Sequence, residues 1–171
     1  LTLASGASVR LSAAQNQSFT GTITAPGTGG SGEEITIVGD GTVTTLANIE
    51  NYTIEDDATD ARTVAVIHAA THITAASSSD AITFSFGALT YTGTISGDTT
   101  VDDIISLDNG ADISGGTITN VAALTLASGA SVRLSAAQNQ SFTGTVTAPG
   151  TGGGEEITIV GDGTVTTLAN I

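Results

Sequence analysis

The sequence predicts an all-β chain, and within that class a parallel β-solenoid. Three observations support this. Thr and Ser alternate with Ile, Val, Leu and Phe over short runs, which is the period-two pattern of strands. Gly, Asp and Asn recur between these runs and supply tight corners. The chain has no Trp and only 4% aromatic residues, whereas a β-sandwich, the alternative fold, usually centres on a few large aromatic side chains.

A long internal repeat sets the domain organisation. The 22 residues from Leu1 recur unchanged from Leu124, and the likeness continues to the end of the chain with one substitution and one deletion, at Ser31. This period of 123 residues exceeds the about 20–50 residues of a single solenoid coil, so each module should contain several coils. We expect residues 1–123 to be one complete module and residues 124–171 to begin the next, within a longer tandem array. A protein with only two copies is the alternative.

The expected strands follow the alternating runs in chain order. One short helical turn is expected where Ser12 and Gln15 have the spacing of a capping box, and again at Ser135 and Gln138. The Ala-rich segment 64–76 is expected to be strand, with a helix as the alternative, because Val and Ile surround its alanines. At about 20–25 residues per coil and ~4.8 Å between stacked strands, one module would advance roughly 25–30 Å. The expected strand runs are residues 1–3, 8–12, 19–27, 33–41, 42–49, 51–57, 62–70, 72–76, 81–87, 89–97, 102–110, 111–114 and 116–121.

Charge and composition exclude several functions. The chain has 17 acidic residues against three arginines and no lysine, which gives a formal net charge of -14. Three positive charges are too few to neutralise a nucleic-acid backbone, and an anionic membrane surface would repel the chain. No apolar run reaches the roughly 18 residues that span a bilayer. Nucleic acid and membrane insertion are therefore not expected, and the absence of Cys excludes disulfides and thiolate metal sites.

Two stretches carry a family resemblance. ISGGTITNVAALTLASGASVRLSAAQ (residues 113–138) and ITIVGDGTVTTLANIENYTIEDD (residues 35–57) resemble the β-strand repeats of very large bacterial surface proteins, a group of giant adhesins, surface-layer components and fibre-forming proteins. In that group a Gly-Thr-apolar-Thr run followed by LTL or YTI recurs many times. The resemblance implies an extracellular position on the bacterial cell surface, tandem arrays, and a structural or adhesive role without catalytic residues.

The expected function is a non-catalytic structural repeat of an extracellular fibre, layer or adhesin stalk. Its expected partner is itself, as tandem modules or a homopolymer filament, together with surface glycans or other cells. One alternative is a ligand-binding β-solenoid for ice or glycans, and another is a polysaccharide-degrading enzyme, which a pair of carboxylates could serve. Thr-x-Thr pairs raise the ice-binding alternative, but their uneven spacing favours an ordinary solvated β-face. The pairs are Thr22/Thr24, Thr42/Thr44, Thr92/Thr94 and Thr117/Thr119.

Acidic turns are the candidate metal sites. Calcium takes six to eight oxygen ligands, which Asp-rich loops can supply. The alternative is that Asp and Asn simply form turns and keep the surface soluble. His68 and His72 have an H-x-x-x-H spacing, but on a strand they would lie about 13 Å apart, too far for one ion. We expect calcium as the one cofactor and assembly that strengthens with divalent cations. The expected ligands are Asp40, Asp98, Asp102, Asp103 and Asp112.

Overall fold

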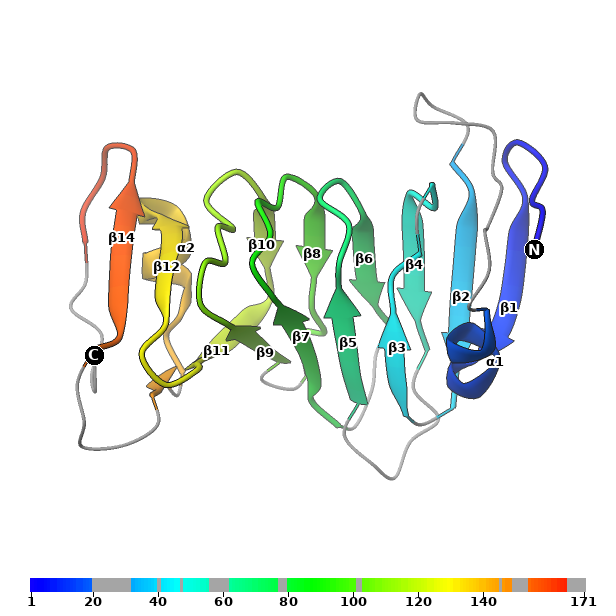
Figure 1. Cartoon of the computed structure of the whole chain (residues 1–171), viewed down its shortest axis with the longest axis horizontal. Helices are drawn as coiled ribbons and strands as arrows, with labels where there is room; N and C mark the ends of the chain where they lie inside the picture. Colours follow the sequence, from blue (N-terminus) through cyan, green and yellow to red (C-terminus); the bar gives the residue numbers. More distant parts are fainter. Residues whose placement is uncertain are drawn as a thin grey trace.

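Short strands stack side by side along the long axis of the molecule, with β1 (Ser8–Ser12) and β14 (Glu156–Val160) at opposite ends (Figure 1). The computed structural model describes residues 1–19, 32–39, 41–46, 48–55, 62–76, 80–100, 103–144, 146–148 and 154–165. These residues form a parallel β-solenoid. The predicted fold class is therefore confirmed.

Two long sheets and one shorter row of strands form the faces of the solenoid. The first sheet contains, in spatial order, β1 (Ser8–Ser12), β2 (Glu34–Val38), β4 (Asn51–Ile54), β6 (His72–Ala75), β8 (Thr94–Ser96) and β10 (Thr117–Thr119). The second contains β3 (Thr42–Thr44), β5 (Arg62–Val66), β7 (Ile82–Phe86), β9 (Asp103–Leu107), β11 (Val121–Leu126) and β13 (Val146–Thr147). We call the remaining row the third face. It consists of single bridges from Thr90 to Asp112 and from Asp112 to Arg133, followed by β12 (Ser131–Ser135) and β14 (Glu156–Val160).

The strand register gives the length of a coil. Asn51 on β4 pairs with His72 on β6, 72 − 51 = 21 residues later, and His72 pairs with Thr94 on β8, 94 − 72 = 22 residues later. Both values lie within the predicted range. Every strand pairing among the described residues is parallel, whereas a β-sandwich is built from antiparallel strands.

Alternate residues of each strand point into a core of Ile, Val and Leu, as the period-two pattern predicts. Four large aromatic side chains are also fully buried there, which the sequence did not lead us to expect: Tyr52, Tyr91, Phe84 and Phe86. Tyr91 packs edge-on against Phe86, with ring centroids 5.1 Å apart, and its hydroxyl donates a hydrogen bond to the Thr71 carbonyl at 2.6 Å. Gly116 makes room for this ring, because a Cβ atom there would lie 2.6 Å from the Tyr91 Cδ1 atom.

Two short helices interrupt the strands at equivalent points of the repeat. They are α1 (Ala13–Ser18) and α2 (Ala136–Ser141). Each begins with the predicted capping box: Ser12 Oγ accepts from Gln15 N at 3.1 Å, and Gln15 Oε1 accepts from Ser12 N at 2.8 Å. The same pair of bonds recurs between Ser135 and Gln138.

The two copies of the repeat pair their strands in the same register. Ser8 is opposite Glu34 in the first copy, and the matching residues Ser131 and Glu156 are opposite each other in the second. The second copy lacks a counterpart of Ser31, yet this deletion does not shift the register. A one-residue slip would turn every core side chain of the strand outward, so the alternation of apolar residues holds the register.

The repeated segment lies on a different face of the solenoid in each copy. β1 belongs to the first sheet, five further strands of that sheet follow it, and β11 of the second sheet then leads to β12 on the third face. From β1 to β12 the chain therefore completes five coils and then passes two more faces, which is one face short of six coils. Identical sequences therefore occupy neighbouring faces in successive modules.

Candidate binding face and acidic turns

Hydroxyl side chains form a continuous ladder on the outside of the first sheet. Stacked strands lie about 4.8 Å apart, so these side chains form a regular row. All of them are at least partly exposed. The ladder runs through Thr36, Thr53, Thr74, Ser96 and Thr119, each opposite the next in the strand register.

The predicted Thr-x-Thr pairs contribute to this ladder only in part. Thr117 and Thr119 lie side by side on β10, next to Thr94 and Ser96 on β8. On β2, β4 and β6 the positions beside the ladder are Glu34, Asn51 and His72, which are not hydroxyl residues. Two adjacent rows of hydroxyls therefore occur only on β8 and β10 among the described strands of this sheet. Thr42 and Thr44 lie on the second sheet, Thr92 precedes β8 and belongs to no strand, and Thr22 and Thr24 lie outside the described residues.

Asp98 and Asp103 lie together at the corner between β8 and β9. Asp103 is fully buried, and its two carboxylate oxygens accept hydrogen bonds from the backbone N–H groups of Ile82 and Asp98, both at 2.7 Å. Asp98 in turn accepts from Thr100 N at 2.9 Å and from Thr100 Oγ1 at 3.0 Å. These carboxylates stabilise the corner, and Asp103 links two neighbouring coils.

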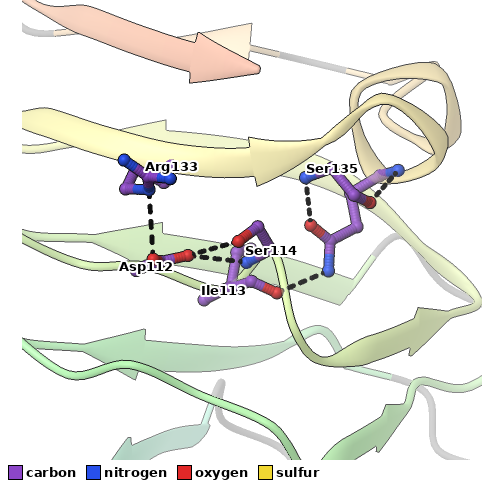
Figure 2. A network of polar contacts seen from close by, with 6 residues as sticks. Asp112, Ile113, Ser114, Arg133 and Ser135 are labelled. Carbon is purple, nitrogen blue, oxygen red and sulfur yellow. Dashed lines mark hydrogen bonds and ion pairs between the residues drawn. The ribbon is translucent and has the colours of Figure 1, made fainter. Parts of the chain in front are cut away.

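Asp112 lies on the third face and has two kinds of partner. Its Oδ1 atom accepts from Ser114 N at 3.0 Å and from Ser114 Oγ at 2.6 Å, which is the local turn chemistry expected of Asp. Its Oδ2 atom forms an ion pair with Arg133 Nε at 3.1 Å on the following coil (Figure 2). This carboxylate therefore connects the end of one module to the beginning of the next.

The calcium site stays a prediction. Asp40 and Asp102 lie outside the described residues, and Asp98 and Asp103 share a corner that does not include Asp112. The part of the chain that the structure describes holds no group of three or more His, Asp or Glu side chains arranged around a common point.

The two histidines lie on different parts of one coil. His72 begins β6, and His68 lies in the turn after β5. Partial burial lowers the pKa of His68 below its ordinary value of 6.5. His68 lines two neighbouring cavities with volumes of about 460 and 280 Å³. The larger cavity is also lined by Asn16, whose buried Nδ2 atom has no hydrogen-bond partner among the described residues.

Arg62 has a structural role that sequence reasoning missed. Its side chain is buried, and Nη1 donates to the Glu55 carbonyl at 2.7 Å while Nη2 donates to the Gly39 carbonyl. The Glu55 carbonyl precedes Arg62 in the same coil, and the Gly39 carbonyl lies between β2 and β3 of the preceding coil. The guanidinium therefore joins two neighbouring coils at a corner. The composition alone presents this residue as one of only three cations and gives no sign that it is buried.

Both described helices have six residues, and neither they nor any other described segment form an apolar helix long enough to cross a membrane. No known protein family, curated protein or solved structure matches the chain.

Proposed function

We propose that the chain is a non-catalytic structural module of an extracellular bacterial surface fibre, surface layer or adhesin stalk. In this proposal tandem modules continue a single β-solenoid and so build a rod. The module's main partner is another copy of itself, and surface glycans or other cells are the partners of the assembled rod.

One observation carries this proposal: the second copy of the repeat continues the stack begun by the first. Arg133 on β12 bridges to Asp112 of the preceding coil, and β12 then pairs with β14 as β1 pairs with β2. The junction between modules is thus an ordinary step of the solenoid. A module that ends in the surface on which its successor stacks can be repeated without limit.

The chemistry of the described residues supports a structural role. The fully buried carboxylate of Asp103 accepts hydrogen bonds from backbone N–H groups of the solenoid, and Asp112 pairs with Arg133. The extracellular location rests on the resemblance to bacterial surface repeats, with which a chain without Cys is consistent.

A tandem series tests the proposal. Chains lengthened by one, two and three copies of residues 1–123 should form rods whose length, measured by small-angle X-ray scattering, grows by a constant step. Five coils and two faces at ~4.8 Å per coil give a step of roughly 27 Å. Scattering typical of separate globules joined by flexible connections would contradict the proposal, because the length would then not grow by a constant step for each added module.

The hydroxyl ladder favours a second candidate, a face that binds ice or a glycan surface. Thermal hysteresis and glycan-array binding test it directly. Thr74→Tyr would place a bulky ring in the ladder and abolish such binding, whereas Thr63→Tyr, at an exposed position of the second sheet, is the matched control. Equal binding by both variants would exclude the ladder as the binding face.

A further inference from the structure

Two neighbouring cavities share His68 and lie where the connections of the third face are short. Between β5 and β6 the chain contains only residues 67–71, whereas between β9 and β10 it contains residues 108–116. The cavities lie beside the shorter connection and have volumes of about 460 and 280 Å³. The larger volume is within the range of about 300–1,000 Å³ that is typical of small-molecule sites.

The larger cavity has a buried hydrogen-bond donor that lacks an acceptor. Asn16 of α1 lines this cavity and is only 1% exposed. Its Oδ1 atom accepts from Thr44 N at 3.0 Å, which fixes the side-chain amide and leaves Nδ2 unpaired among the described residues. A buried donor without a partner is unfavourable, so an occupant that presents an oxygen atom here would gain a hydrogen bond.

The smaller cavity has the opposite requirement. Glu50 lines it, and the buried Oε2 atom of this side chain has no hydrogen-bond donor among the described residues. His68 lines both cavities. Partial burial lowers the pKa of His68, so its ring is neutral at pH 7 and offers one N–H donor and one nitrogen acceptor. A ligand that extends past His68 therefore meets an unpaired donor on one side and an unpaired acceptor on the other.

Apolar side chains supply much of the remaining wall. Phe19, Leu46 and Ile67 line the larger cavity, and Ile49 lines the smaller one. Ile67 is 54% exposed although it is a large apolar residue. Apolar walls with a few polar groups are the usual composition of a small-molecule site.

The unpaired groups select the chemical class of the ligand. An anion would be repelled by Glu50 and by a chain with a formal net charge of -14. An ammonium group has three donors but no acceptor for Asn16 Nδ2. A hydroxyl group can both donate and accept, and the C–H faces of a sugar ring are apolar. A neutral saccharide therefore meets the requirements of both cavities.

We propose that the two cavities form one binding site for a short neutral saccharide. The saccharide extends past His68, accepts a hydrogen bond from Asn16 Nδ2 and donates one to Glu50 Oε2. The C–H groups of its rings pack against Ile67 and Phe19. This site goes beyond the proposed structural function, because it gives the module a defined pocket for a ligand.

The site is separate from the surfaces described above. The larger cavity lies between α1 and the coils that follow it, which supply Thr44 and Ile67, and the smaller one lies between two of those following coils. Both are therefore away from the side of α1 on which a preceding module would stack. The hydroxyl ladder lies on the outside of the first sheet, whereas the cavities lie along the third face.

Titration of the whole chain with neutral disaccharides tests the site. Maltose, cellobiose, lactose and chitobiose are the probes, and heteronuclear NMR follows the side-chain amide of Asn16. We expect saturable shifts of this amide with at least one disaccharide, and no shifts with methylammonium or inorganic phosphate. Asn16→Asp identifies the resonance and should abolish binding, since it keeps an acceptor for Thr44 N but removes the donor. Asn139→Asp is its control, because Asn139 has the same position in α2 and lines neither cavity.

Substitutions at exposed positions keep the test independent of folding. Ile67→Ser removes an apolar wall and should weaken binding about tenfold. Val165→Ser is the matched control, since Val165 is also 54% exposed, lines neither cavity and should leave binding unchanged. Glu50→Gln keeps the shape of the side chain and should weaken binding several-fold, because a charged acceptor forms the stronger hydrogen bond. Thr74→Tyr, which obstructs the hydroxyl ladder, should bind as the wild type does.

The absence of saturable shifts with all four disaccharides would overturn the inference and would leave the cavities to trapped water. Equal binding by Ile67→Ser and the wild type would also overturn it, and so would loss of binding in Thr74→Tyr, which would place the ligand on the ladder. Shifts of the Asn16 amide with methylammonium or phosphate would refute the class of ligand. Rods that lengthen in the tandem series without saccharide binding would leave the proposed function standing without this site.

Discussion

The contact between modules can be measured by comparing one substitution at two identical positions. Gln15 and Gln138 have the same neighbours in sequence and the same capping box. They differ because Gln138 also donates two hydrogen bonds to the preceding coil while Gln15 is exposed. We therefore expect Gln138→Ala to destabilise the chain more than Gln15→Ala does.

The size of the difference follows from those two bonds. Either substitution removes the side-chain half of a capping box, which costs up to about 1 kcal/mol. A buried hydrogen bond contributes about 1 kcal/mol net, so Gln138→Ala should cost about 2 kcal/mol more than Gln15→Ala. For a chain of this length that difference corresponds to a melting temperature lower by roughly 4–8 °C.

Urea unfolding followed by circular dichroism measures both variants, and hydrogen exchange at the Arg133 amide reports on the junction itself. Gln17 and Gln140 provide the matched control, since each donates to the carbonyl of an equivalent residue, Thr42 and Thr164. Their alanine variants should cost the same. Equal losses for Gln15→Ala and Gln138→Ala would refute the reasoning, because the stacked coil would then contribute nothing through this side chain.

Three further predictions concern alkali, a buried carboxylate and calcium. Burial raises the pKa values of Tyr52 and Tyr91 above the ordinary 10.0, so the unfolded state loses these protons first as the pH rises. The free energy of unfolding should therefore fall above about pH 10, by ~1.4 kcal/mol per pH unit for each tyrosine. These are the only tyrosines, so absorbance at 295 nm should rise together with loss of circular dichroism, and gradual ionisation of the folded chain would contradict this. Asp103→Asn leaves one acceptor oxygen for two backbone N–H groups and should cost about 1–3 kcal/mol in urea unfolding, while Asp108→Asn at an exposed turn should cost almost nothing. If calcium binds the acidic turns, a chelator should lower the melting temperature and weaken assembly, and an unchanged chelated sample would remove calcium from the proposal.

The fold was predictable because its main determinant is local. Alternation of Thr and Ser with Ile, Val and Leu specifies strands with one buried face, and Ser12 with Gln15 specifies a helix start. Both signals lie within a few residues of the structure that they produce. The sandwich alternative remained because the same alternation serves both folds, and the parallel pairing decided between them.

The candidate site was less predictable because its partners come from other coils. The sequence identified Asp103 as an acidic turn residue. Its carboxylate accepts a hydrogen bond from the N–H group of Ile82, which lies 21 residues away in the sequence. The Tyr91 ring depends likewise on Gly93 and on Gly116 in the next coil, where a Cβ atom would meet the tyrosine. Such contacts depend on the register between coils, which a single strand pattern does not contain.

The face shift between modules bears on which function the repeat can serve. Thr36 belongs to the hydroxyl ladder of the first sheet, but its counterpart Thr158 lies on β14 of the third face. In a tandem array a given surface feature would therefore return to the same face only after three modules, about 80 Å at ~4.8 Å per coil. A flat ligand such as ice would meet each module's ladder on a different side, whereas the stacking contacts at Arg133 and Gln138 recur at every junction regardless of face. The geometry thus favours stacking into a rod over recognition of one flat surface. Labels on the Ser8 counterpart of each module should appear on one side of the rod in every third position in electron micrographs, and labels aligned along a single side would contradict the shift.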